Sequence, residues 1–165
     1  MELALATGRG PLLLTDLEGR RPLLRDEDVV AFGFRDGAES AESGMQPLPP
    51  GLHAIGLEGV RAAGAAAAAR HAVGRLTGGG IAGYWIHLDV DILDDALMPA
   101  VDYRLPGGLT WAELESVLRT ALSGDGAVGF DVTIFNPRLD PDGTIAARLT
   151  ECLHRGLSAR TGHRT

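Results

Sequence analysis

The segment Trp85–Asp95 reads WIHLDVDILDD, an apolar run that leads directly into a cluster of aspartates. Side chains two positions apart on a strand point to the same side, so a strand here places Asp89 and Asp91 on one face. His87 shares that face if the strand stays regular over these residues. Two ionised carboxylates held this close repel each other, so the pair shares a proton, faces basic side chains or binds a cation.

Oxygen ligands suit Mg²⁺ or Mn²⁺, and a neighbouring imidazole favours Mn²⁺ or Zn²⁺. An Asp-x-Asp pattern at the end of a strand is also found as a helix cap or a brace within a loop. Taken alone, the aspartate pair therefore leaves both a metal site and a structural role open.

Strands and helices alternate on both sides of this segment. After an early helix and before a frayed end, the pattern predicts strands over 28–36, 52–57, 81–91 and 126–135, and helices over 58–76, from Thr110, and over about 145–157, with a long loop over 37–51. Thr110 and Glu113 fit a capping box. This alternation predicts a doubly wound α/β fold, a parallel sheet covered on both faces in three α/β/α layers. We expect one domain over residues 1–157 and a flexible tail over 158–165, and ligands of such folds bind at the carboxyl ends of the strands.

Composition excludes several classes of function. The net charge of −7 and the pI of about 5.1 argue against a nucleic-acid partner. All 15 basic residues are arginines, so no mechanism can use a lysine of this chain. Neither a signal peptide nor an apolar run of membrane-spanning length is present, which predicts a cytoplasmic protein with no membrane partner. The single cysteine, Cys152, is expected in the core of the last helix.

The order of motifs from Asp89 onward resembles one enzyme family. DVD, a following LD, MPA, PGGLT and a Glu three residues after the Thr resemble the arginase, agmatinase and formiminoglutamase family, the ureohydrolases. GAVGFDVTIFNP, residues 126–137, resembles the closing strand of that family, and DVVAFGFRD, residues 28–36, resembles the strand before its mid-chain loop. The resemblance spans about residues 1–157. It implies an arginase-like fold and hydrolysis of a C–N bond in a linear amidine or guanidino compound by hydroxide activated on two Mn²⁺ ions.

Carried over by position, the resemblance implies that Asp89 and Asp91 are metal ligands, one of them bridging both ions. Asp94 matches the aspartate of a Leu-Asp-Pro element, and we expect it to brace the loop. His87 is not among the usual ligands of the family and is expected in the second shell or in the core.

The closing strand departs from the family pattern. Ile134 stands where family members that use guanidines have an acidic residue that contacts the substrate. It is a candidate for the substrate pocket, but an isoleucine cannot pair with a cation, so the substrate is expected to differ from arginine. Strand alternation points the adjacent Thr133 to the other side.

Four further ligands of the family, an early histidine and an Asp-x-His-x-Asp cluster, have no counterpart in this sequence. The chain is about half the usual length of the family, so we expect it to be a truncated reading frame, a misplaced start or a fragment, lacking the N-terminal half. The Mn²⁺ site of this chain is then expected to be partial, because the remaining ligands are missing. The expected partner is a small-molecule substrate. A strand edge left unpaired by the missing half predicts a homo-oligomer.

Two other functions compete with this interpretation. LDVDIL superficially fits the Asp-x-Asp motif of haloacid-dehalogenase-like phosphatases, but those enzymes carry it near their start and use a lysine, which is absent here. The second alternative is a non-catalytic arginase-like half-domain that serves as an assembly or regulatory module.

Overall fold

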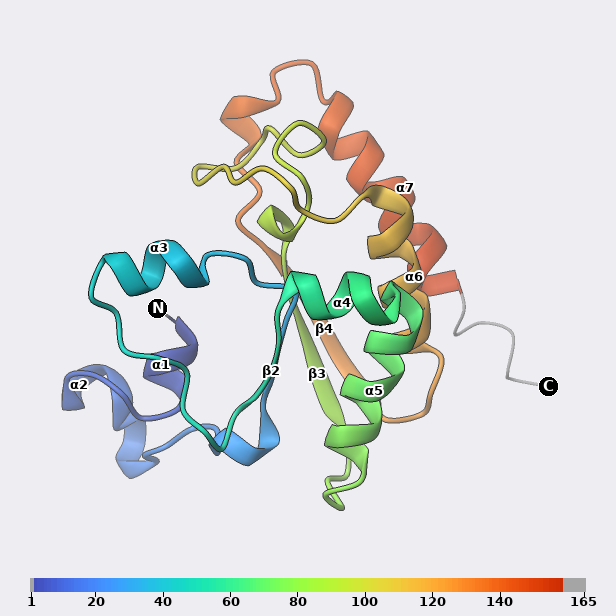
Figure 1. The fold of residues 1–165 in the computed structure, drawn as a ribbon. Coiled ribbons are helices and arrows are strands. Elements are labelled where there is room, and N and C mark those ends of the chain that lie inside the picture. The colour runs from blue at the N-terminus through green and yellow to red at the C-terminus, as the bar shows by residue number, and fades with distance from the viewer. Residues whose placement is uncertain (1, 159–165) are drawn as a thin grey trace.

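The protein is described here by a computed structural model that covers residues 2–158, so the predicted tail lies, apart from Ser158, outside the described residues. Within residues 2–158, no helix is both long and apolar enough to cross a membrane. Helices and strands alternate along the chain (Figure 1). The elements are α1 (Glu2–Ala6), α2 (Leu12–Thr15), β1 (Val30–Phe32), α3 (Gly37–Glu42), β2 (His53–Ile55), α4 (Leu57–Ala63), α5 (Ala65–Thr77), β3 (Tyr84–Asp89), α6 (Trp111–Leu122), β4 (Ala127–Thr133) and α7 (Thr144–Leu157), with short 3-10 turns η1 (Leu17–Gly19), η2 (Asp26–Asp28), η3 (Val90–Ile92) and η4 (Pro137–Leu139).

The strands form two parallel pairs, as the alternating pattern predicted. β1 pairs with β2, and β3 pairs with β4. In the second pair, Trp85 lies opposite Gly129, His87 opposite Asp131, and Asp89 opposite Thr133. Because side chains alternate along a strand, this register brings the alternate residues of β3 and β4 onto one face.

The other face of β3–β4 carries the core. α6 packs between α5 and α7, and it buries Leu114, Leu118 and Leu122 at helical spacing. From the sheet, Tyr84 and Leu88 point into the same core. Each such buried leucine contributes about 1.5–3 kcal/mol to folding by leaving water. The apolar alternation of β3 is therefore what fixes which face of the strand meets the helices.

The predicted start of α6 is confirmed. Thr110 caps the helix: its hydroxyl accepts a hydrogen bond from the Glu113 backbone N–H at 3.2 Å, and its own backbone N–H donates to Glu113 Oε2 at 2.7 Å. Two orphan backbone donors are thus satisfied at once. The cap fixes where the loop after η3 ends, so it also limits the conformations open to that loop.

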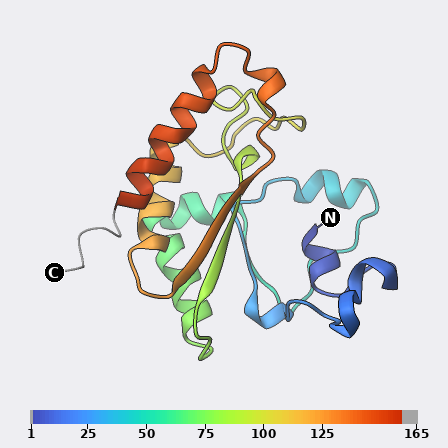
Figure 2. The same ribbon diagram turned by 180° about the vertical axis from the view of Figure 1, so that it is seen from behind.

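The face of β3–β4 opposite the core is open in the part of the chain that the structure describes. Trp85 lies on it with 61% of its surface exposed. Seen from behind, the two strands have no helix in front of them (Figure 2). The predicted covering by helices on both faces is therefore observed on one face of this strand pair within residues 2–158.

Several predicted boundaries were wrong, among them that of the strand expected over 28–36, which is observed only as β1, Val30–Phe32. The helix expected over 58–76 is divided into α4 and α5 by Gly64, whose φ of 82° is outside the helical region. The loop expected over 37–51 contains the short helix α3. The strand expected over 81–91 ends at Asp89, because the chain tightens there into η3.

Candidate metal site

The aspartate pair lies at the carboxyl end of β3. Asp89 is the last residue of the strand, and Asp91 belongs to the 3-10 turn η3. The predicted reason for their proximity was therefore wrong, because the strand alternation stops between them. The two carboxylates nevertheless interact. Burial, and then the negative charge of Asp89, raise the pKa of the partly buried Asp91. A cation bound between the two carboxylates would relieve both causes.

One oxygen of Asp89 is held by its neighbours on the open face. The Thr133 hydroxyl donates a hydrogen bond to Asp89 Oδ1 across the β3–β4 register. His87 Nε2 lies 3.3 Å from the same oxygen. Thr133 is the last residue of β4, and its register with Asp89 places it on the face that carries Asp89. Oδ1 is thus occupied, which orients the carboxylate as a whole.

A second layer of contacts supports His87. Its Nδ1 lies 2.7 Å from Asp131 Oδ2, and the Trp85 indole N–H donates to Asp131 Oδ1. These contacts, the indole hydrogen bond first, lower the pKa of Asp131 below its usual value. His87 is about half exposed on the open face and touches Asp89 directly. The sequence analysis missed Asp131 and Trp85, since strand alternation aligns them only once the register of β3 on β4 is known.

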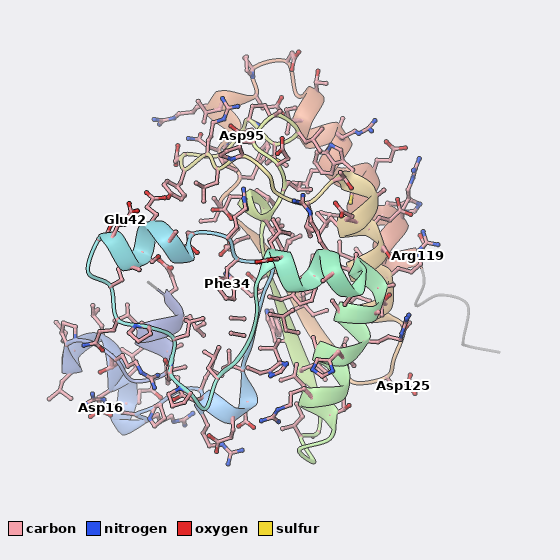
Figure 3. The ribbon with its side chains drawn as sticks, viewed as in Figure 1. Asp16, Phe34, Glu42, Asp95, Arg119 and Asp125 are labelled. Atoms are coloured by element: carbon pink, nitrogen blue, oxygen red, sulfur yellow. The ribbon has the colours of Figure 1, made fainter. Side chains whose placement is uncertain are left out.

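Asp94 lies in the loop that follows η3, next to Asp95, which Figure 3 labels. Asp94 Oδ1 accepts a hydrogen bond from the Ala96 backbone at 3.0 Å, and Oδ2 accepts one from the Gly107 backbone at 2.7 Å. Both hydrogen bonds favour the ionised form and lower the pKa of Asp94. The carboxylate therefore holds two parts of the loop together. Because both of its oxygens accept backbone hydrogen bonds, Asp94 braces the loop in this conformation.

Ile134 follows β4 directly. It is 45% exposed and has a φ of 74°, a left-handed conformation that is unusual for a β-branched residue. The left-handed backbone ends the strand and separates Ile134 from the alternation of β4. Its apolar side chain offers no charge to a cationic substrate.

Arg35, which follows β1, was also missed by the sequence analysis. Its guanidinium donates to four backbone carbonyls around the aspartate turn, among them that of Asp91 at 2.9 Å. A lone arginine after a strand carries no signal of this role, because the acceptors are backbone atoms about 56–71 residues further along the chain.

The donors fit part of a manganese site. Carboxylate oxygens are ligands that Mn²⁺ accepts, and Asp89 and Asp91 both lie at the carboxyl end of β3. Among residues 2–158, however, no group of three or more His, Cys, Asp or Glu side chains could hold a metal ion. A complete two-metal centre therefore does not fit on the described residues, whereas one edge of such a centre does.

Comparisons with known proteins show which family this chain resembles. An 83-residue segment is 37% identical to the mitochondrial arginase of Medicago truncatula and covers 50% of this chain and 24% of that protein. The structure of Bacillus cereus arginase superimposes with a TM-score of 0.79 at 24% identity, over 95% of this chain and 53% of that chain. The formiminoglutamase of Trypanosoma cruzi gives 0.65 at 20% identity, over 82% and 45%. The chain thus spans about half the length of these solved relatives.

The structural likeness confirms the predicted arginase-like α/β fold in partial form. The resemblance first found in the motifs from DVD to PGGLT also extends over most of the chain, because the sequence model of the Arginase family matches residues 19–156. This chain therefore belongs to the arginase family.

Proposed function

We propose that this chain forms one half of a manganese-dependent hydrolase that cleaves a C–N bond in a linear amidine or guanidino compound. The observation that carries the proposal is that Asp89 and Asp91 both lie at the carboxyl end of β3, with one oxygen of Asp89 held by Thr133. Membership of the arginase family supports it. So does the presence of Mn²⁺ in the structure of the Trypanosoma cruzi formiminoglutamase.

Each residue has a separate part in this proposal. The ionised form of the Asp91 carboxylate is disfavoured by burial and by the charge of Asp89, so a bound cation gives it a partner. Asp89 presents its second oxygen while Thr133 and His87 hold the first. A manganese centre supplies activation of water for attack on the amidine carbon. The ligands that this chain lacks come from elsewhere, since two carboxylates alone bind a divalent ion weakly.

The substrate follows from Ile134. An exposed isoleucine at the end of β4 can contact an apolar part of a substrate but cannot pair with a guanidinium. We therefore propose a linear amidine other than arginine. Replacement of Ile134 by glutamate then shifts the preference toward guanidino compounds, provided that the chain is active.

A Mn²⁺ titration by calorimetry tests the metal site directly. The chain is compared with Asp89→Ala and Asp91→Ala, and with Asp125→Ala as a matched control. Asp125 is exposed in the turn before β4, and Figure 3 labels it far from Asp95. Binding that is lost in the first two variants and kept in the control supports the proposal. Absence of binding in the unaltered chain, at Mn²⁺ concentrations high enough to reveal a weak site, contradicts it.

Turnover requires a separate assay. Release of urea or ammonia is measured with Mn²⁺ over a panel of linear amidines and guanidino compounds. Product that depends on both Mn²⁺ and Asp89 establishes an active chain. Mn²⁺ binding without product over the whole panel favours the second candidate, a non-catalytic arginase-like half-domain. The lack of a group of three metal-binding side chains within residues 2–158 is the observation that favours this second candidate.

Self-association is part of the proposal. The open face of β3–β4 exposes Trp85, at 61%, and exposed apolar side chains on a sheet favour contact with another copy. Light scattering after size-exclusion chromatography tests this, and a monodisperse monomer contradicts it. A cytoplasmic location stays a prediction, and the Medicago truncatula relative is named as mitochondrial.

A further inference from the structure

The turn that carries Asp91 rests on the segment that follows β1. Arg35 Nη1 donates to the Asp91 carbonyl at 2.9 Å, and Nη2 donates to the Leu93 carbonyl at 3.2 Å. One guanidinium thus holds the backbone at Asp91, inside the η3 turn, and at Leu93, directly after it. Because a carbonyl's direction is set by the backbone torsions on either side of it, these two hydrogen bonds restrict the conformation of Asp91 itself.

The same guanidinium also holds the loop that precedes α6. Nη2 donates to the Leu105 carbonyl at 2.6 Å, and Nε donates to the Pro106 carbonyl at 3.2 Å. An arginine has five N–H donors in a planar fork, so four carbonyl contacts leave little capacity to bind a substrate anion. Arg35 is therefore placed to hold backbone segments together and not to contact a ligand.

A second, independent contact joins the same two segments. Gly33 is buried with a φ of 76°, and a Cβ at this position would lie 2.6 Å from the Ile92 side chain. Only a glycine lets the chain after β1 approach the η3 turn this closely. Phe34, which Figure 3 labels, is anchored from behind, since its carbonyl accepts a hydrogen bond from the Leu57 backbone at 2.9 Å. The segment that carries Arg35 is therefore itself held in place.

We propose that Arg35 is a positioning residue for the aspartate pair: it holds the η3 turn so that the Asp91 carboxylate stays beside that of Asp89, and it thereby sets the affinity for a divalent cation. The proposal rests on the metal-binding role proposed above. Neither the sequence motifs nor the carboxylates themselves assign this role, because Arg35 reaches the site only through backbone carbonyls.

The test measures Mn²⁺ affinity by calorimetry on the full chain and on Arg35→Met and Arg35→Lys. Arg61→Met is the matched control, because Arg61 Nη2 donates to the Gly108 carbonyl at 2.8 Å, in the same loop but not to a carbonyl that Arg35 holds. We expect Arg35→Met to weaken binding by about tenfold or more, as for other residues that orient metal ligands. Arg35→Lys keeps the charge without the planar fork and is expected to fall between Arg35→Met and the unaltered chain. Arg61→Met is expected to bind like the unaltered chain.

Amide hydrogen exchange without metal separates positioning from general destabilisation. Arg35→Met is expected to speed exchange at the amides of Leu93, Leu97 and Met98, which hydrogen-bond within the turn and the loop after it. Amides of α6 serve as the reference and are expected to change little. Faster exchange throughout the chain, with Mn²⁺ affinity unchanged, indicates a role in stability alone and overturns the proposal.

The remaining outcomes are also decisive. Equal Mn²⁺ affinity in the unaltered chain, Arg61→Met and Arg35→Met overturns the role of Arg35 and leaves the metal site standing. No Mn²⁺ binding by the unaltered chain overturns both the metal site and the role of Arg35. If Arg35→Met does not fold, Arg35→Lys decides, and affinity equal to that of the unaltered chain counts against the proposal.

Discussion

His87 Nδ1 lies 2.7 Å from Asp131 Oδ2, and the two residues are direct register partners on β3 and β4. Two residues further along both strands, on the same face, Thr133 donates to Asp89. Both cross-strand pairs therefore support the carboxylate of Asp89: Thr133 donates to it directly, and Asp131 contacts His87, which lies beside it. The orientation of Asp89 depends on the pairing of β3 with β4 as much as on its own strand.

Replacement of Thr133 by valine removes the hydroxyl donor and keeps the shape of the side chain. We expect Mn²⁺ affinity to fall by about tenfold, because a ligand's hydrogen-bond partner sets its orientation. Thr120→Val is the control, since its hydroxyl donates at 2.8 Å to the Ser116 carbonyl of its own helix. Calorimetry on both variants checks the expectation. An equal loss in the two variants shows that the Thr133 hydroxyl has no specific role.

Asp91 predicts a pH dependence of stability. Its pKa in the folded chain is raised by burial and by Asp89, so the protonated form is favoured by folding. The contribution of this group is fully present below the unfolded pKa, about 3.9, and is lost as pH rises through the raised folded value. Asp91→Asn removes this loss. Without metal, we expect Asp91→Asn to melt above the unaltered chain at pH 7, with a smaller difference near pH 4.

We expect Mn²⁺ to reverse the order of these two proteins, because a cation bound at the proposed site stabilises the folded state of the unaltered chain, whereas Asp91→Asn lacks a charged ligand and gains little. Thermal melts with and without Mn²⁺ at pH 7 measure both effects. A metal-free Asp91→Asn that melts below the unaltered chain contradicts the assignment of an unfavourable charge to Asp91.

Gly108 sits where the loop before α6 crosses the aspartate turn. A Cβ there would lie 2.3 Å from the Leu93 backbone carbon, and residues 93 and 109 form a parallel bridge. Gly108→Ala is expected to cost about 2 kcal/mol or more, because backbone atoms must move apart. Gly124→Ala faces open space and is expected to stay within about 0.5 kcal/mol of the unaltered chain. Urea denaturation of both variants gives the comparison, and equal stabilities would falsify the close approach.

Local patterns predicted the elements that carry the site, and they failed where the chain leaves regular structure. The capping box at Thr110 and the parallel strands were predicted because propensity, spacing and caps agreed. The end of β3 at Asp89 was not, because an apolar run through Ile92 reads the same whether it is a strand or a 3-10 turn. The spacing of Asp89 and Asp91 pointed to a shared place at the end of β3, but the strand alternation behind that prediction stops between them.

The partners of that site were not accessible from the sequence. Thr133 and Asp131 reach Asp89 and His87 through strand register, which a single sequence does not specify. Arg35 reaches it through backbone carbonyls, which have no sequence identity. The family resemblance therefore proposed Asp89 and Asp91 as ligands, whereas the contacts that support them are long-range and required the structure.

Ile134 predicts a stabilising substitution. A left-handed conformation costs an ordinary L-residue about 1–2 kcal/mol, and asparagine tolerates it better than a β-branched residue. Because Ile134 is 45% exposed, Ile134→Asn gives up little burial, and we expect a gain of about 1 kcal/mol. Leu139→Asn is the control, since Leu139 is 46% exposed and is not among the positive-φ residues. Equal responses of the two variants to denaturant indicate that no strain is stored at Ile134.

Cys152 lies in α7 and belongs to the hydrophobic core, so the reactivity of its thiol reports on the packing of that core. Only 5% of it is exposed, and burial raises the pKa of its thiol to about 11, so the predicted core position is confirmed. At pH 8 we expect the native thiol to react with a disulfide reagent far more slowly than the urea-unfolded chain, because the thiolate is the nucleophile. The thiol is favoured by folding, so its contribution to stability is present below the unfolded pKa and is lost as pH rises toward 11. Cys152→Ala is expected to lose less stability than the unaltered chain between pH 8 and pH 10. A native thiol that reacts as fast as the unfolded one contradicts its place between α7 and α6.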